Sequence, residues 1–328
     1  MTMELSFPVP VPPDLLARGD FGAGRNPAFL AACTLVARVA PGGLPILILG
    51  ETGTGKERCA RAVHALSSRR DGPFIAVNCG GLAEALLEAE LFGHARGAFT
   101  GAHDARPGFI EAASGGTLFL DEVGDASPAL QAGLLRVLSE GRYRRVGEAR
   151  ERASDVRVVA ATHEDLEAAV RDGRFRADLW YRLAAVDVAL PPLRARGRDI
   201  VRLAREFLAE QRPGARFDSC ARRALLRYAW PGNVRELRSA VARAACLAPA
   251  GTRIGADFLP PRITATNEGA AAIVGLAGEL RAFETRRIAE ALAEANGSPG
   301  GAARILGVSR QGLWRKLRRA RASAGGAP

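Results

Sequence analysis

A glycine-rich stretch with a single lysine constrains this chain more than any other feature. Residues 50–56 read Gly-Glu-Thr-Gly-Thr-Gly-Lys, directly after the apolar run 44–49 and before a helical pattern. A loop between a buried strand and a helix N-terminus points backbone N–H groups and partial positive charge at a phosphate, and Lys56 would reach the terminal phosphates. The alternative is a glycine-rich turn without a ligand, which the strand, the spacing and the lysine together disfavour. The predicted nucleotide contacts are Gly50, Glu51, Thr52, Gly53, Thr54, Gly55, Lys56 and Glu57.

A second motif supplies carboxylates for the same chemistry. Residues 115–122 read Gly-Gly-Thr-Leu-Phe-Leu-Asp-Glu, which is an apolar strand that ends in two adjacent acids. Asp121 would hold Mg²⁺, directly or through water, and Glu122 would polarise the attacking water. A surface Asp-Glu pair fits poorly behind a buried strand. At Glu57 the general phosphate-loop motif has Ser or Thr as a magnesium ligand, so that hydroxyl is missing here.

The wider pattern predicts a doubly wound α/β core followed by helices. Apolar runs at 74–77, 117–120 and 156–161 read as further buried parallel strands that alternate with helical stretches. After residue 193 the strand signals stop, and 200–211, 219–228 and 233–247 read as helices of an all-α lid. The predicted division is a short extension at 1–20, an α/β subdomain at 21–190, a lid at 191–260, a linker at 261–275 and a helical domain at 276–328.

Composition limits the compartment and the partners. The five cysteines are scattered without metal-type pairing, and no run of about 18 apolar residues occurs, so we expect a soluble, cytoplasmic protein without membrane contact. The net charge of +11 favours a polyanionic partner such as nucleic acid. Lys56 and Lys316 are the only lysines, and the high arginine content by itself carries little functional information.

Together these motifs resemble an AAA+ ATPase, and one segment narrows the family. Residues 97–102 read Gly-Ala-Phe-Thr-Gly-Ala, which matches the loop by which sigma-54-dependent transcriptional activators engage the sigma factor. The family's phosphate loop commonly carries Glu after the lysine, so Glu57 is a family feature. Read without the family, an apolar tip between small residues suits a partner contact, or a loop that tucks one Phe into its own core. The resemblance assigns sigma-54 contacts to Gly97, Ala98, Phe99, Thr100, Gly101 and Ala102.

The resemblance also assigns roles in ATP hydrolysis. Asn78 matches the asparagine that holds the catalytic glutamate until the nucleotide state changes, and Thr162 with His163 lies where the family senses the γ-phosphate. The stretch 173–183 matches the one that carries arginine fingers, which implies that Arg176 and Arg182 reach a neighbouring subunit's nucleotide. A solvated salt bridge is the alternative for each arginine. Within Trp-Pro-Gly-Asn-Val-Arg at 230–235, Arg235 resembles the lid arginine that contacts ATP in its own subunit.

The C-terminal residues resemble a Fis-type helix-turn-helix. An amphipathic pattern at 283–295 is followed by a short helical stretch, a Gly307 turn, a Ser309 N-cap and a basic helix. Residues 281–328 carry ten basic and three acidic side chains. Gly312 stands where the family usually has Thr, and glycine within the basic helix costs about 1 kcal/mol of helix propensity. A dimerising helical hairpin is the alternative. The candidate DNA contacts are Ser309, Arg310, Gln311, Arg315 and Lys316.

The resemblance implies an activator that binds upstream DNA and uses ATP and Mg²⁺ to open promoters held by the sigma-54 RNA polymerase holoenzyme. It implies a ring, by analogy a hexamer, made of this chain or of two related chains. About 20 residues precede the core, where relatives carry a sensory domain, so we expect control by a separate regulatory protein or by expression. The rivals are a AAA+ motor for another substrate and a DNA-binding repressor with a degenerate ATPase.

Overall fold

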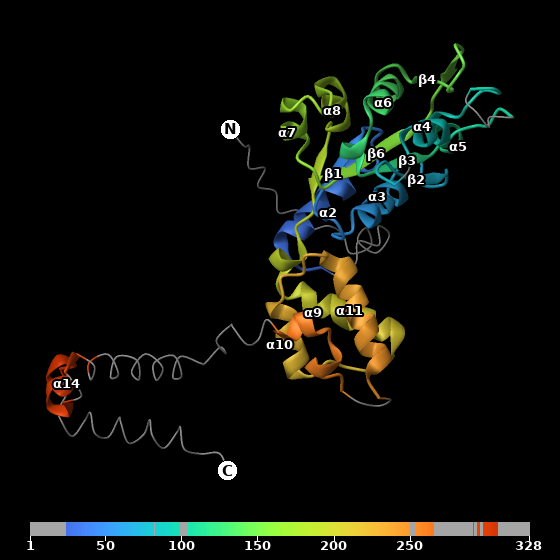
Figure 1. Ribbon diagram of the computed structural model, residues 1–328. Helices are drawn as coiled ribbons and strands as arrows, with labels where there is room; N and C mark the ends of the chain where they lie inside the picture. The colour runs from blue at the N-terminus through green and yellow to red at the C-terminus, as the bar shows by residue number, and fades with distance from the viewer. Residues whose placement is uncertain are drawn as a thin grey trace. The chain divides into compact units, whose positions relative to one another are not determined.

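The computed structural model describes residues 24–81, 83–98, 104–249 and 253–265, and in the C-terminal part residues 291, 294–295 and 298–307. The chain divides into two compact units, Met1–Ala265 and Thr266–Pro328. The first unit contains an α/β core and a helical lid (Figure 1). No helix of the described residues is long and apolar enough to cross a membrane.

A sheet of five parallel strands forms the centre of the core, in the order β2-β3-β6-β1-β7. Because β1 lies between β6 and β7, the strand order reverses at β1, and such a switch point opens a crevice at the carboxyl ends of the strands. Four strands confirm the predicted apolar runs, and the short fifth strand β7 was not predicted. The strands are β1 Ile46–Leu49, β2 Phe74–Asn78, β3 Thr117–Asp121, β6 Arg157–Thr162 and β7 Asp187–Ala189.

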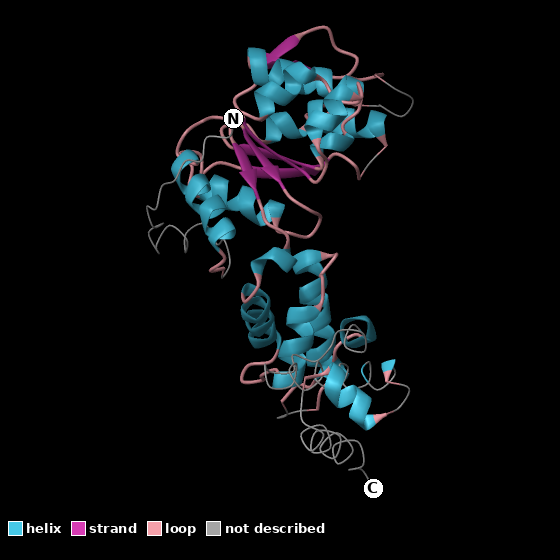
Figure 2. Ribbon diagram, turned by 90° about the vertical axis from the view of Figure 1, so that its left-hand side faces the viewer, coloured by secondary structure: helices cyan, strands magenta, loops and turns pink. Residues whose placement is uncertain are grey.

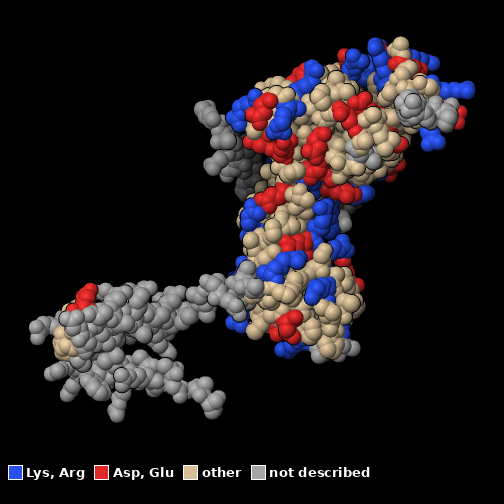
Figure 3. Space-filling model, viewed as in Figure 1, with Lys and Arg blue, Asp and Glu red and all other residues tan. Residues whose placement is uncertain are grey.

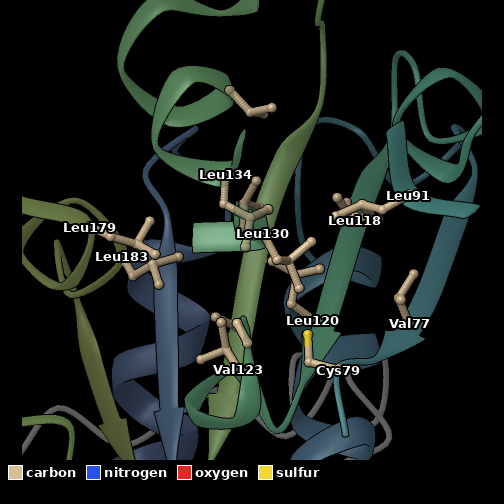
Figure 4. Close-up of a cluster of buried hydrophobic side chains, with 14 of the residues drawn as sticks. Val77, Cys79, Leu91, Leu118, Leu120, Val123, Leu130, Leu134, Leu179 and Leu183 are labelled. Carbon is tan, nitrogen blue, oxygen red and sulfur yellow. The ribbon is translucent and has the colours of Figure 1, made fainter. Parts of the chain in front are cut away.

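Alternation of side chains along each strand creates two cores, one on each face of the sheet. Leu118 and Leu120 of β3 point to one face, where they pack among side chains of five helices, whereas Phe119 points to the other face and two helices. Figure 4 shows the first cluster, with Leu120 near Leu130 and Leu134 of the covering helix. The helices of the first cluster are α4 Glu84–Phe92, α5 Phe109–Ala112, α6 Pro128–Glu140, α7 Leu166–Arg171 and α8 Ala177–Leu183, and those of the second are α2 Pro27–Val39 and α3 Lys56–Ala65.

The described residues of the lid form helices joined by loops (Figure 2), and they have their own hydrophobic core. The three predicted helices are present, and Trp230 is fully buried among them. The lid continues to Ala265, beyond the expected boundary at residue 260, because Leu259 and Ile263 are buried in the same core. The helices are α9 Asp199–Gln211, α10 Ser219–Arg227, α11 Asn233–Leu247 and α12 Pro261–Ala265.

Part of the second unit is described around one short helix. Helix α14 covers Pro299–Ile305, and its Ala302 and Ala303 are buried against Ala291. Gly307 has a φ of 65°, a left-handed conformation that suits glycine after a helix end. The predicted short helix and Gly307 turn are therefore confirmed. The candidate DNA contacts at 309–311, 315 and 316, and Gly312, lie outside the described residues.

Candidate nucleotide site

The glycine-rich loop follows β1 and leads into α3 as its sequence predicts. Gly53 and Gly55 have φ values of 81° and 104°, which side-chain-bearing residues rarely adopt. A Cβ on Gly53 would lie 2.4 Å from the carbonyl oxygen of Gly232, so the loop also passes very close to the lid backbone. Helix α3 starts at Lys56 and presents its N-terminus to the loop. This is the geometry of a phosphate cradle.

Lys56 connects the loop to the acidic end of β3. Its Nζ donates to Gly50 O at 3.1 Å and to Glu122 Oε1 at 3.0 Å, and the lysine is only 6% exposed. The other carboxylate oxygen of Glu122 accepts from the backbone N–H of His163 at 3.2 Å and lies 2.7 Å from His163 Nδ1. Glu122 has a φ of 53°, a strained conformation for this residue type. The three side chains therefore form one hydrogen-bonded row.

The two acids of β3 differ in their electrostatic surroundings. Burial raises the pKa of Glu122, but the hydrogen bonds from His163 and Lys56 outweigh it and hold that pKa below its usual value. Burial and then the charge of Glu122 raise the pKa of Asp121, although Lys56 opposes them. Asp121 is thus a half-buried carboxylate whose negative charge is only partly offset by the nearby ammonium of Lys56. It fits a Mg²⁺ ligand, because Mg²⁺ usually takes one or two carboxylates plus phosphate and water.

The lid contacts the glycine-rich loop mainly through the side chain of Glu51. Glu51 accepts hydrogen bonds from Arg194 at 2.8 and 2.5 Å and from Asn233 Nδ2 at 3.1 Å. Asn233 is fully buried, also donates to Thr52 O at 3.0 Å and accepts from Leu193 N at 2.8 Å. The hydrogen bonds of Arg194 and Asn233 lower the pKa of Glu51 to about 2. The carboxylate predicted to contact nucleotide is therefore engaged by the lid.

A cavity of about 330 Å³ opens between the loop and the lid. Arg235 lines it beside Gly53, as expected of an arginine that contacts nucleotide in its own subunit. The sequence did not identify Phe207 and Arg238 as residues of the cavity. Their place on the helices of the lid can be inferred only once the contact between the lid and the glycine-rich loop is known. The cavity is lined by Thr52, Gly53, Gly55, Lys56, Glu57, Arg58, Asp121, Glu122, Phe207, Val234, Arg235 and Arg238.

Three other predicted residues take places that their assigned roles did not anticipate. Glu57 is paired with Arg61 at 2.7 Å, one turn along α3. Asn78 Oδ1 accepts from Gly80 N at 2.9 Å, while Glu122 is bonded to Lys56 and His163. Thr162 is buried, and its hydroxyl accepts from Glu164 N at 3.0 Å. The nucleotide-linked roles of all three stay predictions.

The candidate arginine fingers lie on α8, at the protein surface. Arg176 precedes the helix, and its guanidinium donates to both carboxylate oxygens of Asp178 at 3.0 and 2.8 Å. Arg182 is exposed in the last turn of the helix. Neither is among the described residues that line the nucleotide cavity. Their position is compatible with a role toward another copy of the chain, which stays a prediction.

The predicted sigma-54 loop has a well-held base. Gly93 and Gly108 approach so closely that a Cβ on Gly108 would lie 2.2 Å from Gly93 N. His94 pairs with Arg106 across this neck and with Val146, which lies in the loop of an unpredicted hairpin between β4 Arg142–Arg144 and β5 Glu151–Ala153. Gly97 and Ala98 belong to the described part, whereas residues 99–102 lie outside it. The glycines at 93 and 108 thus allow an excursion to leave and return through one point.

The fold and this site identify the protein as a P-loop ATPase of the AAA+ type. Comparison with known proteins then specifies the family. The chain matches the sigma-54 interaction domain over residues 23–189 and the AAA+ ATPase lid domain over residues 194–274. It also matches the bacterial regulatory protein, Fis family, over residues 279–319. The protein therefore belongs to the sigma-54-dependent transcriptional regulators.

Individual relatives agree with this assignment. The hydrogenase transcriptional regulatory protein HoxA of Cupriavidus necator is 44% identical, over 88% of this chain and 63% of HoxA. The transcriptional regulatory protein ZraR of Klebsiella oxytoca is 46% identical, over 92% of this chain and 69% of ZraR. The crystal structure of NtrX from Brucella abortus in complex with ADP superposes with a TM-score of 0.70 and 34% identity, over 91% of this chain and 69% of NtrX. The chain thus spans about two thirds of these proteins.

Proposed function

We propose that this protein is an ATP-driven transcriptional activator that opens promoters held by the sigma-54 RNA polymerase holoenzyme. The observation that carries the proposal is the hydrogen-bonded row of Lys56, Glu122 and His163, of which Lys56 and Glu122 line the cavity beneath the lid. A degenerate ATPase has no need to keep a buried lysine and a desolvated carboxylate together. Membership of the family then indicates that the energy of ATP hydrolysis acts on the sigma-54 holoenzyme.

The residues of the site account for the hydrolytic step. ATP binds with its phosphates on the loop N–H groups, and the ammonium of Lys56 turns from Glu122 to the β- and γ-phosphates. This transfer frees Glu122 to orient and polarise the attacking water. Asp121 would hold Mg²⁺, which would supply positive charge to the phosphates. Arg235 adds positive charge from the lid of the same subunit.

The sheet links this step to the predicted sigma-54 loop. Asn78, the last residue of β2, aligns with Asp121, and Cys79 N donates to Asp121 O at 2.8 Å. Helix α4 follows β2 and ends at Gly93, the neck of the excursion. A change at the acidic end of β3 therefore has a short path to the neck, through the backbone hydrogen bond to Cys79 and then along the chain through α4. Phe99 and Thr100, at the proposed tip, would press on sigma-54.

The complete activator would be a ring on DNA in the cytoplasm. Arg176 and Arg182 would complete the nucleotide site of a neighbouring subunit, so hydrolysis would require assembly, by analogy into a hexamer. The neighbours are copies of this chain or a related chain, and a separate regulatory protein would set when assembly occurs. Residues 279–319, including Arg310, Gln311, Arg315 and Lys316, would bind an upstream DNA site.

Open-complex formation on a sigma-54 promoter tests the proposal. Purified protein, core polymerase and sigma-54 are incubated with ATP or with a non-hydrolysable analogue, and strand opening is probed with permanganate. Opening that requires hydrolysis is the expected result. Vigorous ATP hydrolysis without opening would favour a motor for another substrate. The Thr100→Ala variant should keep ATP hydrolysis and DNA binding but lose opening, and retained opening would contradict the loop assignment.

A further inference from the structure

A hollow in the lid carries a concentration of arginine that the site above does not use. It has a volume of about 700 Å³ and lies along α9 and α10. Lysine and arginine make up 46 of 328 residues, so nine residues taken at random would include one or two. Here six of nine are arginine, which composition does not explain. The hollow is lined by Arg25, Arg198, Val201, Arg202, Arg205, Ser219, Arg222, Arg223 and Leu226.

Helical spacing places these side chains on facing surfaces of two packed helices. Arg198, Arg202 and Arg205 are four and three residues apart, so they follow one face of α9 from its N-terminal cap. Arg222 and Arg223 belong to the adjacent α10, and the two helices share the lid core. Figure 3 shows several blue Lys and Arg patches on the lid, with fewer red ones. We call this set of arginines, with Arg25, the arginine hollow.

The nearby carboxylates bind other groups, so they offset little of the positive charge of these arginines. Asp199 is 3% exposed and accepts from the backbone N–H groups of Arg25 and Asn26 at 2.8 and 3.1 Å. Asp218 caps α10 by accepting from Ala221 N at 2.7 Å. Glu206 lies 3.8 Å from Arg202, a loose and partly exposed pair. No described carboxylate lines the hollow itself.

We propose that the arginine hollow binds the phosphate backbone of double-stranded DNA, as a contact additional to the helix-turn-helix. Guanidinium groups bind phosphate oxygens through two parallel hydrogen bonds, and closely spaced uncompensated arginines suit a repeating polyanion. The contact is independent of sequence, because backbone phosphates carry no base information. This inference rests on the proposed DNA binding by residues 279–319.

Chain connectivity selects DNA as the occupant. The lid ends at Ala265 and the Fis-family match begins at residue 279, so thirteen residues join them. Thirteen residues reach at most about 45 Å when fully extended. DNA held by the C-terminal domain is therefore tethered to the lid by a segment of limited length, and tethering raises the effective concentration of DNA at the lid. At this raised effective concentration, even a weak contact between the arginine hollow and DNA phosphates forms in a substantial fraction of the molecules.

Salt dependence of DNA binding tests the proposal with the full chain. The probe is a fluorescein-labelled random-sequence duplex, and affinity is measured by anisotropy over a range of KCl concentrations. Each neutralised phosphate contributes about 0.9 to the slope of log Kobs against log salt concentration. The variant Arg198→Gln/Arg205→Gln/Arg223→Gln should lower the magnitude of that slope by about 2 to 3. Its ATP hydrolysis should equal that of the unmodified protein.

A matched control removes the same charge from other exposed positions, Arg136→Gln/Arg150→Gln/Arg243→Gln. It should leave the slope unchanged. Equal slopes for both triple variants and the unmodified protein would overturn the arginine hollow while leaving DNA binding by the C-terminal domain intact. An unmodified protein that binds no duplex would overturn both. Lost ATP-dependent assembly in sedimentation, with an unchanged slope, would instead mean that the hollow faces another copy of the chain.

Discussion

The two sets of cationic groups proposed for catalysis differ in how completely they are assembled within one chain. Lys56 is 6% exposed and already bonded to Glu122, which in turn is bonded to His163. Arg176 is about half exposed and paired with its neighbour Asp178, and Arg182 faces solvent. The subunit thus preorganises its own half of the site, whereas the proposed second half would depend on a neighbouring subunit. Preorganisation within the chain and completion by assembly have separable effects on hydrolysis.

The largest expected effect concerns the exposed half. Arg182→Ala and Arg176→Ala should each lower kcat for ATP hydrolysis, by about 1000-fold if the arginine is a true finger. The reason is that charge on the transferring phosphoryl group loses its stabilisation. Phosphate release is measured above the concentration at which assembly is complete. Arg171→Ala, an exposed arginine on α7, is the control and should keep full activity.

Mixing variants shows whether the two halves belong to different subunits. Arg182→Ala keeps an intact loop, and Lys56→Ala keeps intact arginines. A mixed ring therefore contains some complete sites, and mixing the two inactive proteins should restore part of the activity. Mixing Lys56→Ala with Asp121→Ala, which are both defective in the same half, should restore none. Absence of rescue in the first mixture would contradict action in trans.

Removal of the lysine is the next largest perturbation. Lys56→Ala should lower kcat/KM by about 100-fold or more, because the phosphates lose a buried cation. The same change leaves Glu122 without its ammonium partner, so the pKa of Glu122 should rise. Nucleotide binding is measured with a fluorescent ATP analogue. Full binding by the variant would mean that the loop backbone alone holds the phosphates.

Loss of His163 should affect the pH profile more than affinity. His163→Ala removes a hydrogen bond that keeps the pKa of Glu122 low. In the proposed mechanism the carboxylate form is the active one, so the acidic limb of the kcat profile should move to higher pH, while kcat near neutrality should change little because Glu122 stays ionised there. His163→Gln, which keeps a donor, should restore most of the original profile. An unchanged profile in His163→Ala would show that the contact does not tune Glu122.

The smallest effect is expected at the contact between loop and lid. The pKa of Glu51 is lowered from 4.5 to about 2, so its stabilising contribution is present above pH 4.5 and is lost as the pH falls toward 2. Glu51→Gln should therefore remove part of the acid dependence of stability in that window. At neutral pH the lowering of Tm should be about 2 °C, since the pair is partly exposed. Unfolding is followed by circular dichroism, with Glu210→Gln as the control.

Much of the architecture could be predicted from local pattern. The runs that became β1, β3 and β6 are apolar because both faces of a central parallel strand are buried, whereas β2 was predicted from its apolar residues although it lies at the edge of the sheet. Strand β7 was not predicted because it has three residues, of which only Val188 is buried. The end of the lid was misplaced because the Pro260-Pro261 pair resembles a linker, whereas Pro261 begins a helix whose Ile263 fills the lid core.

The amino-acid sequence by itself determined the phosphate loop, the acidic strand end and the family, since each depends on neighbouring residues and their backbone freedom. Tertiary structure alone decided which charged groups meet. Glu51 and Asn233 are 182 positions apart, and Glu122 and His163 are 41 apart. No local pattern specifies such pairs, because they follow from the packing of the lid on the loop and from the register of β3 beside β6. The arginine hollow has the same origin, in the packing of α9 against α10.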